Sequence, residues 1–421
     1  MLSPITIRYA FRPVRRSLAT GEVAGLFGLP EAEPPHVVAE NLSLDVRPGD
    51  LVLFTGPSGS GKSSLLRAAA AQLDATDAFA LPLPDVPLID ALPGSVAERL
   101  ATLAGCGLAE ARLLLRTPAE LSEGQRYRFR LALALANPGR QSGGELNAHP
   151  RTPVRGSPFV AADEFTATLD RTLAKVVAFN VRKLVSRAGV GLLAATTHED
   201  VVEDLRPDLW VRCADGWVEA ERRDWKSRRV SFADELWVSE GSPSDWPYFA
   251  RWHYRGDRLA FVQRVVLLWH GREPVGVCVF AAPAAALSAR SRYFGLRNPR
   301  SSVALAALNE QLWLLQRVVL HPTYRGAGLA AAFVRRACEL CPVNWVETLS
   351  AMGRANPVFE RAGFARVGVI GRSRRARSGL AQFAGPTARV SDRTRAAGHL
   401  SDPVYYVFDN RGRVPDPPRS S

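Results

Sequence analysis

The stretch GPSGSGKS at residues 56–63 decides the fold of the first half of this chain. It follows the apolar run LVLFT (51–55) and precedes SLLRAAAAQL (64–73), an order that predicts a buried strand, a glycine-rich loop and a helix. In such a loop the glycines let backbone N–H groups approach phosphate oxygens, the lysine reaches the β- and γ-phosphates, and the serine hydroxyl ligates Mg²⁺. The sequence therefore predicts an α/β domain that binds a nucleoside triphosphate.

Four further motifs follow the loop. They are LSEGQ (121–125), PFVAADE (158–164), LD (169–170) and LLAATTHED (192–200). The first opens a helical run. The second places Asp163 and Glu164 after an apolar strand, where one carboxylate can hold Mg²⁺ and the next can polarise water. The last brings His198 to the end of another apolar strand.

This order resembles the ATP-binding-cassette (ABC) ATPases over roughly residues 35–220. The resemblance implies a Mg²⁺ site at Ser63 and Asp163, Glu164 as the general base, and His198 as a sensor of the γ-phosphate. In this family the signature motif contacts the ATP of a second subunit, so a homodimer is implied. The ATP-binding residues implied are Gly56, Pro57, Ser58, Gly59, Ser60, Gly61, Lys62, Ser63, Ser122, Gly124 and Gln125.

The first half also departs from the family pattern. Only about 60 residues separate Lys62 from the signature, fewer than transporter cassettes usually have. No clear Q-loop glutamine is present, and Asp85 or Asp90 could take its place. No aromatic residue is an obvious partner for adenine, with Phe27 and His36 as weak candidates. The Gly/Pro/Arg-rich insertion at 137–158 is typical of a solvated loop.

A second glycine-rich loop, HPTYRGAGLA, occupies residues 321–330. It lies between the apolar run LWLLQRVVL (312–320) and an apolar helical run. This order of strand, R-x-x-G-x-[GA] and helix resembles the GCN5-related N-acetyltransferases (GNAT). VNWVETL (343–349) stands where the family has a splayed partner strand, and NPVFERAGF (356–364) fits its late helix. A hairpin is expected around the turn at 270–271.

The second resemblance implies a mixed α/β acyltransferase fold and acetyl-CoA or another acyl-CoA as cofactor. Backbone N–H groups at the start of the helix would hold the pyrophosphate. The acyl-CoA contacts implied are Val319, Leu320, Arg325, Gly326, Ala327, Gly328, Leu329, Ala330 and Asn356.

The acid and base of this second site stay open. The tyrosine with which the family often protonates the departing thiolate is replaced by Phe359. Substitutes are Tyr324, Ser350 and Cys341, or no residue at all. Glu347 is the first candidate for the general base, and a structural carboxylate is the equal alternative. His253 is the second candidate, against a packed aromatic cluster.

Charge separates the two halves. Residues 1–220 carry 23 basic and 25 acidic residues, whereas residues 221–421 carry 31 and 16, a net of +15. A polyanionic partner is therefore expected for the second half. That half is also weakly similar to phage Mom-type enzymes that modify adenine in DNA. The candidate phosphate contacts are Arg372, Arg374, Arg375 and Arg377.

We expect five segments along the chain. They are an N-terminal extension (1–34), an ABC-type domain (35–220), a basic linker (221–232), a GNAT-like domain (233–410) and a C-terminal tail (411–421). No apolar run is long enough for a membrane span, and the N-terminus lacks the pattern of a signal peptide. The five scattered cysteines suit a reducing compartment, so a cytoplasmic protein is expected.

The sequence favours a cytosolic ABC-type ATPase fused to an N-acyltransferase that modifies an amine on a nucleic-acid base. One alternative is a DNA- or ribosome-associated ATPase whose second domain only recognises nucleic acid. Another is an acyltransferase for a protein or a small-molecule amine. The replacement of the family tyrosine by Phe359 keeps the first alternative open.

Overall fold

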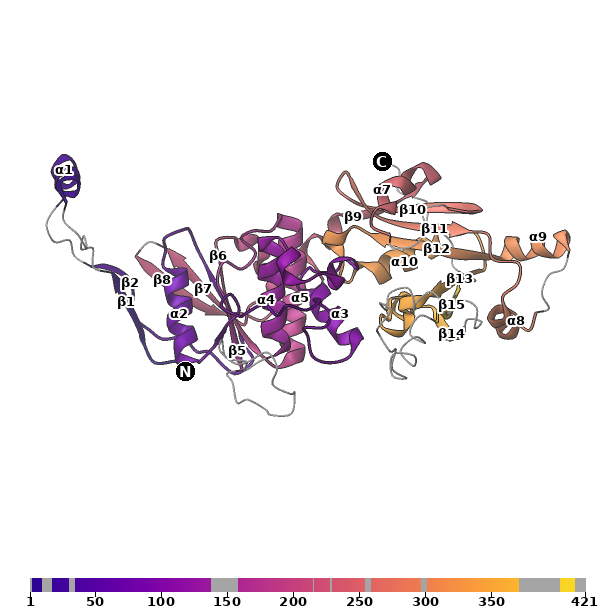
Figure 1. Ribbon diagram of the computed structural model, residues 1–421. Coiled ribbons are helices and arrows are strands. Elements are labelled where there is room, and N and C mark those ends of the chain that lie inside the picture. The colour runs from indigo at the N-terminus through magenta and orange to yellow at the C-terminus, as the bar shows by residue number, and fades with distance from the viewer. Residues whose placement is uncertain are drawn as a thin grey trace. The chain divides into compact units, whose positions relative to one another are not determined.

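The computed structural model describes residues 2–9, 17–29, 35–137, 158–214, 216–227, 229–253, 259–296, 301–370 and 402–412. The chain divides into two compact units, Met1–Ser231 and Phe232–Ser421. Each unit is built around its own sheet (Figure 1). Within the described residues, no helix is both long enough and apolar enough to cross a membrane.

The first unit holds a six-stranded sheet in the order β4-β5-β6-β3-β7-β8. Its strands are β3 (Leu51–Thr55), β4 (Thr76–Asp77), β5 (Phe159–Ala162), β6 (Gly191–Thr196), β7 (Leu209–Ala214) and β8 (Trp217–Arg222). All neighbours are parallel except β7 and β8. The strands predicted before the glycine loop and before Asp163 are confirmed.

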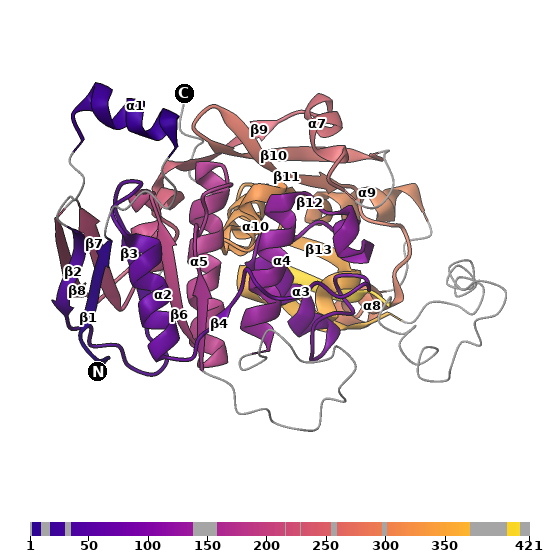
Figure 2. The same cartoon turned by 60° about the vertical axis from the view of Figure 1, so that its left-hand side comes forward.

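Helices cover both faces of this sheet (Figure 1, Figure 2). Alternate residues of β3 face opposite cores, because side chains of a strand point alternately to its two sides. Val52 and Phe54 pack with α2 (Lys62–Gln72), whereas Leu51 and Leu53 pack with a three-helix layer. That layer comprises α3 (Val96–Gly105), α4 (Glu123–Ala136) and α5 (Arg171–Ala188).

Two expected boundaries differ from the structure. β1 (Ile5–Tyr9), inside the expected extension, pairs antiparallel with β2 (His36–Leu42), and Ile5 joins the core beside α2. The remaining helices of this unit are α1 (Leu18–Phe27) and α6 (Val202–Leu205).

The expected linker is largely tied to the first unit. It begins with the end of β8, and Asp204 accepts hydrogen bonds from both the backbone N–H and the hydroxyl of Ser231 at 2.8 Å. Arg206 donates to the carbonyl oxygen of Ser227 at 2.6 Å. These contacts come from residues distant in sequence, so local composition alone suggested a freer segment.

The second unit holds a seven-stranded sheet in the order β14-β15-β13-β12-β11-β10-β9. Its strands are β9 (Leu236–Gly241), β10 (Val262–His270), β11 (Glu273–Ala281), β12 (Leu312–Leu320), β13 (Trp345–Ser350), β14 (Ala365–Val369) and β15 (Val404–Asp409). The hairpin predicted at 270–271 is confirmed, since β10 and β11 pair from His270↔Glu273 onward.

Five helices accompany this sheet. They are α7 (Trp246–Ala250), α8 (Ser288–Phe294), α9 (Ser302–Gln311), α10 (Leu329–Glu339) and α11 (Val358–Ala362). Trp246 and Phe249 of α7 pack on Val277 and Val279 of β11. Phe333 of α10 lies close to Gly276, which faces the opposite side of the same strand.

β12 and β13 are the parallel pair of this sheet, and they pair over three residues only. The register runs from Leu312↔Trp345 to Leu314↔Glu347. Beyond that point β12 continues along β11, and β13 continues along β15, without further pairing between them in the described ladder. A gap between two adjacent strands therefore opens toward the second glycine loop.

Candidate functional site

The phosphate loop of the first unit requires glycine at two tight positions. A Cβ atom on Gly56 would lie 1.8 Å from the carbonyl oxygen of Cys213, and the φ angle of 141° is rare for other residues. A Cβ atom on Gly61 would lie 2.1 Å from Cγ1 of Val38, again at a positive φ of 87°. The loop is thus held between β7 and β2, and its shape depends on these two glycines.

Two polar groups of this loop, the ammonium of Lys62 and the hydroxyl of Ser60, are buried. Lys62 is 8% exposed, and its ammonium donates to the carbonyl oxygen of Pro57 at 2.5 Å. Burial lowers the pKa of Lys62. The hydroxyl of Ser60 is buried without a partner among the described residues. A buried ammonium and an orphaned hydroxyl both favour an anion in this loop.

The expected metal ligands lie together. The hydroxyl of Ser63 donates to Oδ1 of Asp163 at 2.9 Å, and the same oxygen accepts the backbone N–H of Glu164 at 3.0 Å. Mg²⁺ typically takes one or two protein oxygens and completes its shell with water and phosphate oxygens. The pair Ser63 and Asp163 fits that preference. Arg67 also approaches Asp163, at 3.6 Å.

The parallel sheet brings the other reactive residues to the same edge. Glu164 follows β5 and His198 follows β6, and the carboxyl ends of parallel neighbours meet where ligands bind in such sheets. Glu164 has a φ of 52°, in the left-handed region that costs energy for a non-glycine residue. Its exposed carboxylate forms no hydrogen bond or ion pair with the described residues. The Glu164 carboxylate is therefore open to solvent.

The LSEGQ motif begins α4 as the sequence predicted. Ser122 is the N-cap: its hydroxyl accepts the N–H of Gln125 at 3.3 Å, and the side chain of Gln125 accepts the N–H of Ser122 at 3.1 Å. Gly124 lies against Thr168, whose hydroxyl would be 3.3 Å from a Cβ atom. Ser122 and Gln125 thus bond to each other at the helix start, and the other N–H groups of the first turn have no partner within the helix.

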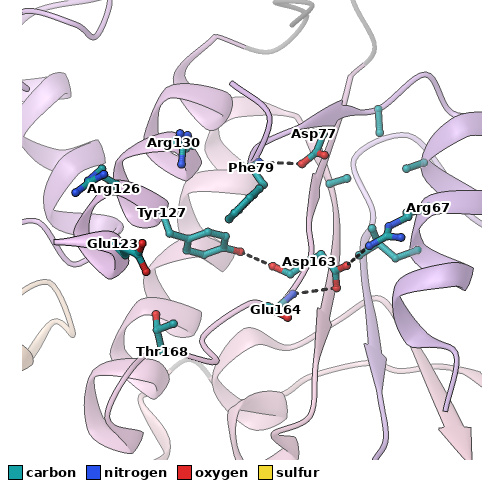
Figure 3. A pocket seen from close by; sticks show the side chains of 14 residues that line it. Arg67, Asp77, Phe79, Glu123, Arg126, Tyr127, Arg130, Asp163, Glu164 and Thr168 are labelled. Carbon is teal, nitrogen blue, oxygen red and sulfur yellow. Dashed lines mark hydrogen bonds and ion pairs between the residues drawn. The ribbon is translucent and has the colours of Figure 1, made fainter. Parts of the chain in front are cut away.

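A pocket of about 550 Å³ adjoins the metal ligands (Figure 3). Its lining residues are Leu66, Arg67, Ala70, Ala75, Asp77, Phe79, Glu123, Arg126, Tyr127, Arg130, Ala161, Asp163, Glu164 and Thr168. The hydroxyl of Tyr127 donates to the backbone carbonyl of Asp163 at 2.9 Å, which ties α4 to the end of β5. Burial, with Asp163 next, raises the pKa of Tyr127, so its phenol stays neutral.

Asp77 is a site residue that sequence reasoning missed. It ends the edge strand β4, pairs with Ala161 and lines the pocket beside Asp163. The two carboxylates considered for this place, Asp85 and Asp90, are exposed and outside the pocket lining, and Asp90 approaches Arg99 at 3.9 Å. The two-residue strand is too short to produce a visible hydrophobic pattern. A search for any acidic residue between α2 and the signature would have found Asp77.

The structure also points to a different aromatic residue near the loop. Tyr9 ends β1, pairs with His36, and shares a hydrogen bond with the hydroxyl of Ser64, the residue after Ser63. Phe27 is 76% exposed on α1, a helix without buried residues. Among the described residues, Tyr9 is thus an aromatic side chain held beside the phosphate loop. An aromatic residue at the end of the first strand was the available signal.

In the second unit the glycine loop has the geometry of an anion cradle. Gly326 and Gly328 have φ angles of 88° and 83°, and Gly328 is the N-cap of α10. The N–H groups of the first turn of α10 therefore have no partners within the helix. Arg325 uses its guanidinium internally, with bonds to the carbonyl oxygens of Leu320 at 3.0 Å and Trp252 at 3.2 Å.

The other residues expected to contact acyl-CoA differ in their exposure to solvent. Val319 and Leu320 are 3% and 7% exposed at the end of β12, so contact there would run through their backbone. Asn356 is exposed, and its N–H donates to the carbonyl oxygen of Met352 at 2.8 Å. Ala327, Leu329 and Ala330 belong to the loop and the first turn of α10.

The geometry corrects the first candidate for a general base. Glu347 is 1% exposed, and Arg290 donates to both of its carboxylate oxygens at 2.9 and 2.7 Å. Tyr405 donates to it as well, at 2.8 Å, and burial raises the pKa of that phenol. A carboxylate that is buried and held by three donors is not available to take a substrate proton. Glu347 therefore fits the structural alternative.

The remaining acid and base candidates are mostly engaged. Tyr324 is bonded to Nδ1 of His270 at 2.7 Å. Burial raises the pKa of Cys341 to about 12. His253 packs edge-on against Trp246, whereas the expected cluster was with Trp252 and Tyr254, of which Tyr254 lies outside the described residues. Ser350 is half-exposed, three residues beyond the last pairing of β13 with β12.

Three further expectations have simple outcomes. Phe359 is 7% exposed and packs on Phe364 and Tyr406, so its side chain contributes to core packing. The five cysteines are free thiols and buried. The expected phosphate contacts at Arg372, Arg374, Arg375 and Arg377 lie outside the described residues.

Comparisons with known proteins agree with this geometry. The family model described as "ABC transporter" matches residues 39–78. The chain is 31% identical over 221 residues to the lipoprotein-releasing system ATP-binding protein LolD of Novosphingobium aromaticivorans, covering 43% of this chain and 90% of that protein. This chain belongs to the ABC ATPase family. The match lies in the half that carries the phosphate loop, so the family assignment applies to that half.

Other relatives match the same ABC ATPase domain. The aliphatic sulfonates import ATP-binding protein SsuB 3 of Paraburkholderia xenovorans is 32% identical over 191 residues, covering 41% of this chain and 70% of that protein. Among solved structures, the dimeric structure of MJ0796, a bacterial ABC transporter cassette, aligns with 19% identity and a TM-score of 0.35. That alignment covers 53% of this chain and 100% of that one.

Proposed function

We propose that this chain couples an ATPase cycle in its first unit to acyl-CoA-dependent N-acyl transfer by its second. The acceptor we propose is an amine on a nucleic-acid base. The observation that carries the proposal is the juxtaposition, in the second unit, of the left-handed glycines of the loop with the gap between β12 and β13.

In the ABC ATPase half, Lys62 and the loop N–H groups would bind the phosphates of ATP. Ser63 and Asp163 would hold Mg²⁺, which neutralises charge on the phosphate oxygens. Glu164 would take a proton from the attacking water, because its exposed carboxylate is the unpaired one at this edge. His198 would contact the γ-phosphate. Ser122, Gly124 and Gln125 would complete the site of a second copy, which makes a homodimer the active form.

In the second half, N–H groups at the start of α10 would hold the pyrophosphate of acyl-CoA. The part of acyl-CoA that carries the thioester is an extended chain. The backbone groups left unpaired in the gap between β12 and β13 could form hydrogen bonds with it. In the transfer, the acceptor nitrogen forms a bond to the acyl carbon and loses a proton to solvent. The carbon–sulfur bond breaks, and the thiolate leaves with a proton from solvent or from Ser350.

Charge supports a polyanionic acceptor. Residues 232–421 carry 26 basic and 14 acidic residues, whereas residues 1–231 carry 28 and 27. A positive potential over the second unit would attract phosphates at long range. The ABC ATPase half would then act as a clamp that closes around nucleic acid when ATP is bound.

One specific observation favours a second candidate function. Glu347, Cys341 and Tyr324 are all engaged or buried, so the described residues offer few groups for acid–base work. A second unit that recognises nucleic acid without acylating it would need none of them.

The deciding experiment uses purified full-length chain, radiolabelled acetyl-CoA, and DNA or RNA, followed by digestion to nucleosides and mass spectrometry. An acylated nucleoside that requires intact protein supports the transferase. Unmodified nucleic acid that is nevertheless retained by the protein supports the recognition function. Label transferred to protein or to a small amine instead would move the acceptor to that class.

A further inference from the structure

The pocket beside the ABC ATPase metal ligands contains groups that the proposed reactions do not use (Figure 3). One wall is α4, which contributes Arg126, Tyr127 and Arg130. The opposite wall is α2 with Arg67, and the edge strand β4 supplies the segment with Phe79. A volume of about 550 Å³ is in the range of small-molecule sites.

Two arginines of this pocket have unused donors. Arg126 donates through Nε to the carbonyl oxygen of Leu121 at 2.9 Å, and Arg130 through Nε to that of Leu81 at 3.0 Å. Their terminal nitrogens form no ion pair with the described residues. They stand one helical turn apart, where like charges repel each other. An anion held between them would remove the repulsion and use a fork geometry suited to phosphate or carboxylate.

The pocket also offers aromatic surface. Phe79 is 61% exposed although it is large and apolar, and its ring centroid lies 6.2 Å from that of Tyr127. The guanidinium of Arg130 lies 5.6 Å from the centre of the Phe79 ring. Exposed aromatic rings beside a guanidinium are suited to a flat group that carries negative charge.

Asp77, Glu123, Asp163 and Glu164 are the carboxylates among the pocket's lining residues, and Asp163 and Asp77 already have partners. Asp163 is engaged with Ser63 and with the N–H of Glu164, and Asp77 accepts the N–H of Phe79 at 2.8 Å. They lie toward β4 and β5, away from Arg126 and Arg130 on α4 (Figure 3). A ligand can therefore set its anionic end between Arg126 and Arg130 without facing Asp163 or Asp77 directly, while Glu123 stands on the same helix three residues before Arg126.

A ligand in this pocket would contact two side chains, Tyr127 and Arg67, that interact with Asp163. Tyr127 holds the backbone of Asp163 at 2.9 Å, and Arg67 approaches its carboxylate at 3.6 Å. A ligand that shifts either side chain changes the position or the charge balance of Asp163. Binding in the pocket and hydrolysis of ATP are therefore linked through shared residues.

We propose that this pocket binds a small flat organic anion, an aromatic ring bearing a phosphate or a carboxylate, and that its occupancy changes the rate of ATP hydrolysis. The proposal is independent of whether the second unit transfers acyl groups.

The test uses phenyl phosphate as the probe and the full-length chain saturated with Mg-ADP, so that the phosphate loop is already filled. Calorimetry should give a dissociation constant below about 1 mM. Inorganic phosphate should bind at least tenfold more weakly because it lacks the ring. Arg130→Gln should weaken phenyl phosphate at least tenfold, and Arg126→Gln should do the same.

Arg187→Gln is the matched control, since it removes the same charge from an exposed position in the last turn of α5, outside the pocket. It should leave the affinity for phenyl phosphate unchanged, and all variants should keep their affinity for Mg-ADP. Equal weakening by Arg187→Gln and Arg130→Gln would overturn the site. So would the absence of binding by the wild-type chain at 10 mM probe.

A second readout tests the link to hydrolysis. Saturating phenyl phosphate should change the ATPase rate of the wild-type chain at least twofold and leave Arg130→Gln unaffected. An unchanged wild-type rate despite measured binding would overturn the regulatory part of the proposal.

Discussion

At the residue scale, Glu164 is the side chain that we propose to take the proton of water during ATP hydrolysis. Its backbone adopts a left-handed conformation that is costly for a glutamate, while Asp163 beside it is fixed by Ser63 and the N–H of Glu164. The two hydrogen bonds engage the Asp163 carboxylate and leave the Glu164 carboxylate exposed. We therefore propose that Asp163 holds Mg²⁺ and that Glu164 takes the proton.

We expect Glu164→Gln to keep its affinity for ATP and to lose hydrolysis by a factor on the order of 100 or more, because an amide cannot accept the proton of water. Unhydrolysed ATP should also hold two copies together through Lys62 of one and Ser122 of the other. Single-turnover hydrolysis and light scattering with Mg-ATP measure the two effects. A strictly monomeric variant at high concentration of ATP would contradict the trans arrangement of the signature.

We expect the affinity for ATP to depend on pH because Lys62 titrates. Burial lowers the pKa of its ammonium below the ordinary value of 10.5, so the charge is present at neutral pH and is lost as pH rises through the lowered pKa. Loss of a charged hydrogen bond weakens binding by about 10-fold or more. ATP affinity measured from pH 7 to pH 10 should therefore fall at the alkaline end.

The control for this titration is Lys62→Arg. A guanidinium keeps its charge over the same range, so any remaining affinity should be flat with pH. A wild-type affinity that is equally flat would contradict the assignment of Lys62 to the phosphates.

At the scale of elements, the shape of the second glycine loop depends on how the chain passes from β12 to α10. The strand ends with buried Val319 and Leu320, the two left-handed glycines turn the backbone, and Arg325 ties the turn to β12 and to Trp252. This packing fixes the direction of the first N–H groups of α10. A negative side chain at the same place should exclude an anionic ligand.

We expect Gly328→Glu to abolish binding of acetyl-CoA, by bulk and by Coulomb repulsion. Because Gly328 has a φ of 83°, that change also strains the backbone. Ala330→Asp avoids the strain, since an acidic residue in the first turn stabilises a helix, yet it places a carboxylate where the pyrophosphate would lie.

Calorimetry should show that neither variant binds acetyl-CoA, and an ATPase assay should show that both hydrolyse ATP at the unchanged rate. Lys62→Ala should give the reverse pattern. Failure of the wild-type chain to bind acetyl-CoA or longer acyl-CoAs at millimolar concentration would remove the transferase and leave the recognition function.

At the scale of the whole molecule, charge differs between the two units. The basic residues in excess belong to the second unit, since cutting the chain after Ser231 leaves net charges of +1 and +12. If the excess of basic residues reflected general composition alone, we would expect it in both units. An acidic macromolecule should therefore interact mainly with the second unit.

We expect full-length protein to bind DNA or RNA with an affinity that falls steeply as salt rises, because each neutralised phosphate releases counterions. Residues 232–421 should retain that binding and residues 1–231 should not. Fluorescence anisotropy between 50 and 200 mM salt measures the slope of log affinity against log salt, which is about one unit per phosphate contacted. Equal binding by both pieces, or binding insensitive to salt, would indicate that the charge reflects composition alone.

Short-range sequence patterns predicted much of the first unit. The strand before Gly56, the helix after Ser63, the helix that LSEGQ opens and the strand before Asp163 were all found where the sequence placed them. Each signal lies within about ten residues, as an apolar run or a glycine loop, whose energetics are local. The meeting of Glu164 and His198 at one edge came from the parallel pairing of β5 with β6, because parallel strands carry their carboxyl ends to one side.

Other features of the site lie beyond such patterns. Asp77, Tyr127 and Asp163 share a pocket although up to 86 residues separate them, and β4 is only two residues long. Tyr9 reaches the phosphate loop only because β1 pairs with β2. The sequence also could not distinguish the two roles of Glu347, since its partners Arg290 and Tyr405 come from other elements.

The sequence by itself determined the chemistry of the phosphate loop, the family of the first unit and the uneven charge. These properties depend on residue identity and on spacing within single elements. Only the tertiary structure decided which carboxylates are free and which are paired, where the chain divides, and which side chains surround the pocket. Those outcomes depend on contacts between distant segments, whose burial and pairing are set when the elements pack together.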